Sequence, residues 1–167
     1  MMTMNLSRNA GFTLIELIVV IVILGVLAAV ALPRFAQMQR EARIAKLSGV
    51  LGALKGAAAM AHALQQTQGL ATNASVNMEG QTVTMINGYP TADNGGIMAA
   101  ISMPTAQTQA NEGLSVTTSG TTLTVQALGA PDAPTCSFTY TSPAANYQSP
   151  TYGSSDANGV VPNGAGC

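Results

Sequence analysis

The chain has 167 residues, room for one domain and an extended element, and only 8% of them are charged, against about 25% in an average soluble protein. All six Lys and Arg residues precede residue 56, whereas five of the seven Asp and Glu residues follow it, so residues 56–167 carry a charge of −5. Because phosphate binding requires clustered Lys and Arg, this distribution excludes nucleic-acid recognition by the C-terminal part of the chain.

An apolar segment near the N-terminus dominates the sequence. Residues 17–32 are apolar without a break, and Glu16 carries the one charge between Gly11 and Pro33. A helix over residues 12–32, at about 1.5 Å per residue, would cross the roughly 30 Å core of a bilayer. A plain anchor has no need of a carboxylate. We therefore expect Glu16 to pair with a cation from a neighbouring subunit, the simpler alternative being a tolerated charge at the membrane interface.

The start of this segment carries a specific motif. Residues 11–16 read GFTLIE, follow a short leader that contains Arg8, and precede the apolar run. This order resembles the prepilin signal of type IV pilins and their relatives. The resemblance implies that a prepilin peptidase cuts after Gly11 and N-methylates the new terminus at Phe12. It also implies that Glu16 pairs with the terminal amine of an adjacent subunit during filament assembly.

A competing signal lies further along. Residues 29–31, Ala-Val-Ala, have the small-residue form of an ordinary signal-peptidase site, and Arg8 could provide the positive charge before it. Ordinary secretion would then give a mature chain that begins at Leu32. This alternative requires an unusually long hydrophobic region with Glu16 inside it.

The sequence predicts four successive parts. Residues 1–11 form a leader that is cleaved, and residues 12–33 form a hydrophobic helix for the membrane or the filament core. Residues 34–67 continue this helix as its amphipathic half, and residues 68–167 form a globular β-sheet head with a C-terminal disulfide loop. Pro33 cannot donate a hydrogen bond to the carbonyl of Ala29, so we expect a kink or a loosened turn there.

The amphipathic half has two apolar faces of different kinds. A stripe with spacings of three and four residues should hold the head; it comprises Ile44, Leu47, Leu51, Leu54, Ala58 and Ala61. A second face of small residues indicates close approach of another backbone, either a second helix or the head's own sheet; it comprises Ala42, Ala45, Gly49, Gly52 and Gly56. The helix should end at residues 67–69, where a glycine follows polar residues.

The remaining side chains of this half are less informative. Arg40, Arg43 and Lys46 form a polar stripe that is either solvated or used for contacts between subunits. His62 is the only histidine, and without neighbouring Cys or acidic residues it is more typical of a surface or packing residue than of a ligand.

Short alternating segments follow the helix and predict an antiparallel sheet. Val76 and Met78, then Val83 and Met85, flank a turn at residues 79–80, and the segments 114–116 and 123–125 flank another at 118–120. Residues 136–140 alternate, with Cys136 facing inward beside two aromatic residues. Residues 95–101 favour a short helix capped by Asp93 or Asn94. Tyr89-Pro90 indicates a turn in which proline ends a strand, and residues 142–166 indicate a loop. Four or five strands packed on the helix stripe give an α+β fold, which is also the pilin fold that the resemblance implies.

Cys136 and Cys167 are the only cysteines. An even number in an exported chain indicates a disulfide, and the spacing is too wide for a CxxC redox or zinc motif. Closing a loop of this length stabilises a fold by about 3 to 4 kcal/mol in the chain-entropy model. Two free thiols are the alternative.

No catalytic constellation is visible, since the sequence has one histidine, no glycine-rich phosphate loop and no clustered carboxylates. We therefore expect no enzyme, no cofactor and no metal site. Tyr147 and Tyr152 lie in the C-terminal loop. The simpler interpretation is that they anchor this loop to the sheet, and the alternative is that they bind a glycan.

The resemblance implies a structural subunit that polymerises through its hydrophobic helix into a type IV pilus, a helical homo-oligomer for adhesion, surface attachment and twitching. It implies further partners, namely the prepilin peptidase, the pilus assembly platform and its ATPase, and the inner membrane before export to an extracellular pilus. Residues 87–92, NGYPTA, with residues 33–35 and the Cys136 to Cys167 loop, resemble pilins of the mannose-sensitive haemagglutinin type. The alternatives are a pseudopilin of type II secretion and a membrane-anchored glycan-binding module.

Overall fold

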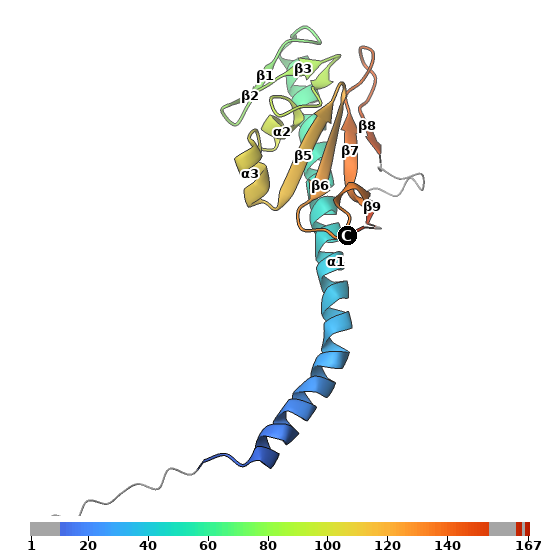
Figure 1. Ribbon diagram of the computed structural model, residues 1–167. Coiled ribbons are helices and arrows are strands. Elements are labelled where there is room, and N and C mark those ends of the chain that lie inside the picture. The colour runs from blue at the N-terminus through green and yellow to red at the C-terminus, as the bar shows by residue number, and fades with distance from the viewer. Residues whose placement is uncertain (1–10, 154–162, 165) are drawn as a thin grey trace, which may run out of the picture. The chain divides into compact units, whose positions relative to one another are not determined.

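The computed structural model describes residues 11–153, 163–164 and 166–167. The chain divides into two compact units, Met1–Met38 and Gln39–Cys167. Helix α1 (Leu14–Thr67) begins in the first unit and ends in the second (Figure 1). The predicted leader, residues 1–11, lies outside the described residues except for Gly11.

Helix α1 continues on both sides of Pro33, which lies inside it. Its C-terminus is closed by hydrogen bonds from Leu70 N–H to the Gln65 carbonyl (3.2 Å) and from Gly69 N–H to the Gln66 carbonyl (3.1 Å). Gly69 adopts a φ of 63°, which the glycine tolerates because it has no Cβ. The predicted end of the helix at residues 67–69 is therefore confirmed, and a kink at Pro33 stays a prediction.

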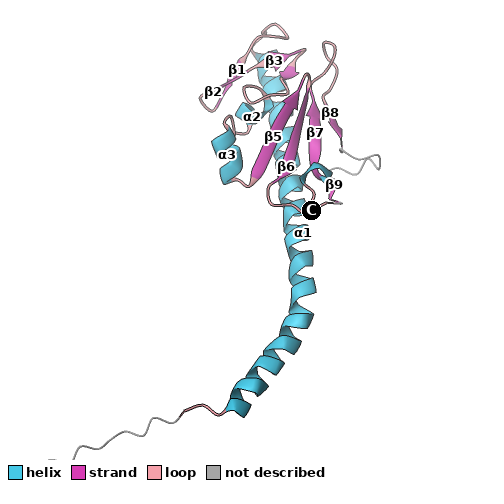
Figure 2. Ribbon diagram, viewed as in Figure 1, coloured by secondary structure: helices cyan, strands magenta, loops and turns pink. Residues whose placement is uncertain are grey.

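The second unit contains the β-structure (Figures 1 and 2). Its main sheet is antiparallel, with the order β5-β6-β7-β8 and with β9 also paired to β7. These strands are β5 (Leu114–Ser119), β6 (Thr122–Ala127), β7 (Cys136–Thr141), β8 (Thr151–Gly153) and β9 (Asn163–Gly164). Two hairpins precede it, β1 (Val76–Met78) with β2 (Gln81–Val83) and β3 (Met85–Ile86) with β4 (Tyr89–Pro90). The short helices are α2 (Ile97–Ala100), α3 (Ala106–Asn111) and the 3-10 turn η1 (Ala133–Thr135).

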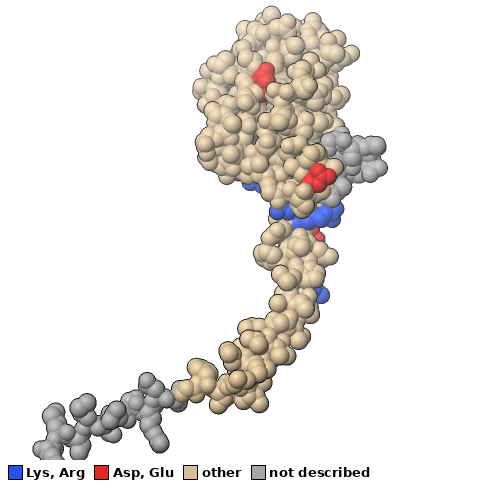
Figure 3. Space-filling model, viewed as in Figure 1, with Lys and Arg blue, Asp and Glu red and all other residues tan. Residues whose placement is uncertain are grey.

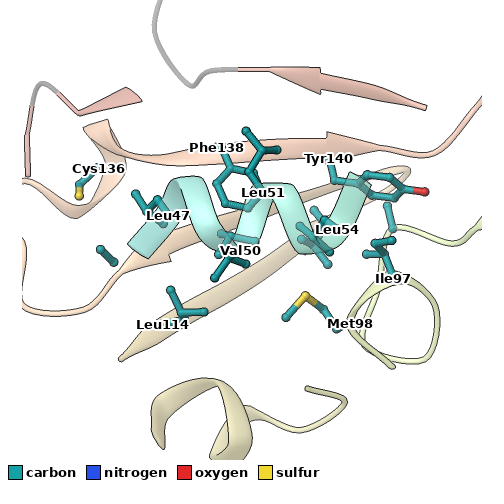
Figure 4. Close-up of a cluster of buried hydrophobic side chains, with 14 of the residues drawn as sticks. Leu47, Val50, Leu51, Leu54, Ile97, Met98, Leu114, Cys136, Phe138 and Tyr140 are labelled. Atoms are coloured by element: carbon teal, nitrogen blue, oxygen red, sulfur yellow. The ribbon is translucent and has the colours of Figure 1, made fainter. Parts of the chain in front are cut away.

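The core of this unit lies between α1 and one face of the main sheet (Figure 4). Alternate residues of each strand face the helix because side chains in a strand alternate between its two faces, and the register aligns Val116, Val125 and Phe138. The α1 residues in this core are Leu47, Val50, Leu51, Leu54 and Ala58. Fully burying a Val or Leu side chain stabilises the fold by about 1.5 to 3 kcal/mol. The α+β prediction and the apolar helix stripe are confirmed.

The β3–β4 hairpin corrects two predictions. Tyr89 and Pro90 are not a turn but a strand paired with Ile86 and Met85, and the turn lies at Asn87 and Gly88, with φ values of 53° and 92°. An Asn-Gly pair supplies the two positive φ angles that such a hairpin requires. The sequence analysis expected Met85 to continue the strand of Val83. Met85 instead belongs to a separate strand, β3.

Two further expectations are corrected. Gly96 is the N-cap of α2, and α2 has no side-chain cap. The Asp93 carboxylate instead accepts a hydrogen bond from the Gly96 N–H at 2.7 Å, one residue before the helical turn.

Residues 142–166 are not entirely a loop, because β8 and β9 both pair with β7. Strands of three and two residues are too short to show a period, so the sequence pattern did not reveal them. Residues 154–162 and 165 lie outside the described residues.

Candidate processing and assembly segment

The described part of the first unit exposes its apolar side chains. Phe12 is 93% exposed, and none of the described residues between it and Met38 is buried. Within the described residues, α1 is the one helix long and apolar enough to cross a membrane by length and composition. Because exposed apolar surface of this extent is unfavourable in water, this segment requires lipid or protein around it.

The start of α1 is fixed by a reciprocal cap between Thr13 and Glu16. The Thr13 N–H and the Thr13 hydroxyl donate to Glu16 Oε2 at 2.9 and 2.8 Å, and the Glu16 N–H donates to Thr13 Oγ1 at 3.3 Å. This is a capping box, which satisfies backbone N–H groups that have no partner within the helix. The carboxylate of Glu16 is therefore engaged within its own chain.

The sequence analysis missed this role of Glu16. The signal was available, because Thr followed three residues later by Glu before an apolar run is the capping-box pattern. The sequence analysis interprets the carboxylate as an interfacial charge or as a partner for another subunit. In the structure the same carboxylate caps the helix, so any partner in a membrane or another subunit must compete with Thr13 for it.

Gly11, Phe12 and Thr13 precede the helix and are exposed. A Cβ placed on Gly11 would have no atom within 4 Å. The Gly11–Phe12 peptide bond is thus accessible, with non-helical backbone on both sides, which an endopeptidase can bind in an extended form.

The other predicted site residues lie in the second unit. Cys136 and Cys167 form a disulfide with a Cα–Cα distance of 4.8 Å, and both side chains are buried. Arg43 of α1 donates from Nη1 to the Cys167 carbonyl at 2.7 Å. The disulfide and this hydrogen bond together tie Cys167 to β7 and to α1.

His62 is a packing residue that joins α1 to the β3–β4 turn. Its ring stacks on Tyr89 with centroids 4.2 Å apart, Nδ1 lies 2.6 Å from the Gly88 carbonyl, and Nε2 lies 2.7 Å from Gln66 Nε2. Nδ1 therefore carries the proton given to Gly88, and Nε2 accepts one from Gln66. Among the described residues, no group of three or more His, Cys, Asp or Glu side chains could hold a metal ion.

The two tyrosines of the C-terminal segment differ. Tyr152 packs against Tyr140, with ring centroids 5.6 Å apart, and Lys55 Nζ lies 5.2 Å from its ring centre. Burial raises the pKa of Tyr152 to about 12 and, more strongly, raises that of Tyr140, whose hydroxyl donates to the Pro90 carbonyl at 2.7 Å. Tyr152 thus anchors its segment, whereas Tyr147 is 76% exposed.

Few charged side chains lie on the face of the second unit that Figure 3 shows. Lys46 Nζ lies 3.7 Å from Glu112 Oε2, and the two side chains form an ion pair. It is exposed, so its contribution to stability is about 0 to 1 kcal/mol.

Comparison with known proteins bears on the first unit. Residues 6–32 match the family model described as the prokaryotic N-terminal methylation motif. This motif is that of type IV pilin-like and pseudopilin-like proteins, and it implies processing by a prepilin peptidase and assembly into a filament. No curated protein and no solved structure matches the chain.

Proposed function

We propose that this chain is a structural subunit of a type IV pilus. The observation that supports the proposal most directly is the match of residues 6–32 to the methylation motif, on the same segment whose apolar side chains are exposed. That segment first dissolves in the inner membrane and then finds equally apolar surroundings among copies of itself. Repeated contacts between unlike surfaces build an open helical polymer when the rotation between subunits does not close a ring.

Processing follows the motif residue by residue. A prepilin peptidase cuts after Gly11 and methylates the new N-terminus at Phe12. The new amine then pairs with Glu16 of a neighbouring subunit, which must give up its bonds to Thr13. The assembly platform and its ATPase lift the subunit out of the membrane, and the second unit comes to lie outside the cell.

A pilus accounts for the second unit better than a pseudopilin of type II secretion does. The long segment between Cys136 and Cys167 favours a pilus, whereas the disulfide that closes it suits any oxidising compartment outside the inner membrane, the periplasm included. Residues 87–92 and 33–35 resemble pilins of the mannose-sensitive haemagglutinin type, which supports surface attachment as the role of the polymer. Twitching would require retraction of the same filament.

The intact mass of the mature chain, recovered by shearing from the cell exterior, tests this proposal. The expected mass begins at Phe12 and includes one added methyl group and the loss of two hydrogens for the disulfide. The same material should contain thin fibres in negative stain. A chain that begins at Leu32 and forms no fibres would establish ordinary secretion instead. A methylated chain that stays in the inner membrane, without surface fibres, would favour the pseudopilin.

A further inference from the structure

A shallow groove of about 300 Å³, lined mostly by apolar residues but also by Glu79 and Ser102, lies in the second unit, between α1, the β1–β2 hairpin and the C-terminal end of α2. Its lining includes Ala53, Ala57, Met60, Met78, Glu79 and Ile101. The α1 side of the groove is built from small residues. A Cβ placed on the neighbouring Gly52 or Gly56 would have no atom within 4 Å, so the head's own sheet does not cover this face.

Glu79 supplies the charge at this groove. It is exposed, lies in the β1–β2 turn, and its carboxylate has no hydrogen bond or ion pair with any residue in the described ranges. The groove therefore combines an apolar floor with one negative charge. It suits an apolar ligand that carries a positive charge beside its apolar side chains.

The first unit presents a surface of that kind. A second apolar depression, of about 560 Å³, is lined by Ala28, Ala31, Leu32, Arg34, Phe35 and Met38. Phe35 is 60% exposed and Met38 is 65% exposed. No described acidic side chain pairs with Arg34. Bulky apolar side chains and one cation on this surface thus complement small residues and one anion in the groove.

We propose that the groove beside Glu79 receives residues 28–38 of a second copy of this chain. Phe35 of the incoming helix lies between Ala53 and Ala57, and its Arg34 pairs with Glu79. Phe35 is 18 and 22 residues away from these alanines in sequence, so the two parallel copies of α1 pair with an offset of 18 to 22 residues. The inference rests on the proposed filament and specifies one of its contacts.

The pairing is favoured by the environment of the two charges. Exposed ion pairs contribute little, but a pair covered by Phe35 and Met60 is shielded from water, which strengthens the attraction. Small residues on α1 let the second helix approach closely. Each copy carries both surfaces, so the contact repeats along a polymer without closing.

Charge reversal in the full-length chain, expressed in cells that assemble it, tests the ion pair. Glu79→Arg and Arg34→Glu should each lower the fraction of subunit recovered in sheared filaments by about fivefold, and the double variant should restore it to within about twofold of the wild type. Thr118→Arg adds a positive charge at an exposed position of β5 away from the groove and should leave the yield unchanged. Equal losses in the single and double variants would overturn the pairing.

A cysteine cross-link tests the contact independently of charge. In filaments, Phe35→Cys combined with Ala53→Cys should give a ladder of covalent oligomers on a non-reducing gel. Each single variant should give no ladder, and neither should Phe35→Cys with Thr117→Cys, which places the second thiol on an exposed strand position of β5. A cross-link to a protein of different mass, or no cross-link in intact filaments, overturns the inference.

The two proposals fail separately. Methylated wild-type filaments without the cross-link and without charge rescue would leave the proposed function standing and remove this contact. Absence of wild-type filaments would remove both.

Discussion

The capping box at the start of α1 allows the local role of Glu16 to be separated from its proposed role between subunits. Thr13→Val removes the hydroxyl that donates to Glu16 Oε2 at 2.8 Å and accepts from the Glu16 N–H at 3.3 Å, but leaves the carboxylate in place. Loss of an N-cap destabilises a helix terminus by about 0.5 to 2 kcal/mol. A loss of about 1 kcal/mol corresponds to roughly a fivefold change in the population of the capped terminus.

Glu16→Ala removes the other half of the capping box, namely the carboxylate that accepts from Thr13, and with it the charge that is proposed to meet a neighbour's amine; the N–H of residue 16 still donates to Thr13 Oγ1. We expect Thr13→Val to reach filaments at a level within about fivefold of the wild type, because losing the cap destabilises the helix terminus by only about 1 kcal/mol. Glu16→Ala should insert in the membrane, because removal of a carboxylate eases insertion, but should be absent from filaments. The assay compares the subunit in sheared filaments with that in the inner membrane, and an intact mass that begins at Phe12 confirms that each variant is cleaved normally.

One result would refute this reasoning. If Glu16→Ala filaments are as abundant as Thr13→Val filaments, the carboxylate acts only as a cap. Glu16→Gln serves as a matched control, because it keeps an oxygen that accepts from Thr13 without the charge. It should resemble Glu16→Ala in assembly but the wild type in the stability of the helix start, because Gln also serves at this position of a capping box.

Three further predictions concern the second unit, each measured by unfolding of the detergent-solubilised full chain. Tyr140→Phe removes the 2.7 Å hydrogen bond to Pro90 and leaves a buried carbonyl without its partner, so the free energy of unfolding should fall by about 1 to 3 kcal/mol; an unchanged urea midpoint would contradict this. Replacing both Cys136 and Cys167 by Ser opens a loop with a sequence separation of 31, and the unfolding free energy should fall by about 3 to 4 kcal/mol. The third prediction is a pH dependence. Burial raises the pKa of Tyr152 to about 12 and raises that of Tyr140 further, whereas an unfolded tyrosine titrates near 10. Stability from these neutral hydroxyls is therefore fully present below about pH 10 and is lost as the pH rises toward 12 and beyond. Thermal unfolding between pH 8 and 12 should show that decline, and Tyr152→Phe should reduce it.

The sequence predicted those elements whose signals are local and repeated. The apolar run after Glu16 is long enough for a bilayer whatever surrounds it, and the stripe through Leu47 and Leu54 reports one helix face at every turn. The alternation of Cys136, Phe138 and Tyr140 indicates a strand with one buried face for the same reason. Periodic patterns average over many residues, so single exceptions do not conceal them.

Elements that depend on pairing between segments could not be predicted from a local pattern. The strand at Tyr89 and Pro90 exists because it pairs with Met85 and Ile86, and the strands β8 and β9 exist because both pair with β7. Two- and three-residue strands have no period of their own, so only their partners define them. The stacking of His62 on Tyr89 likewise joins residues from separate elements.

The candidate segment and the open surfaces of the head show the same contrast between features of consecutive residues and features set by packing. The sequence by itself carries the methylation motif over residues 6–32 and an apolar stretch long enough to span a bilayer, because a linear motif and a span fitted to lipid are properties of consecutive residues. The tertiary structure decided which surfaces the head leaves open. Sequence spacing left two partners for the small residues of α1, but the packing of the sheet on the opposite stripe leaves Gly52 and Gly56 uncovered. Burial is set by the elements that pack against a helix, and these lie far away in the sequence.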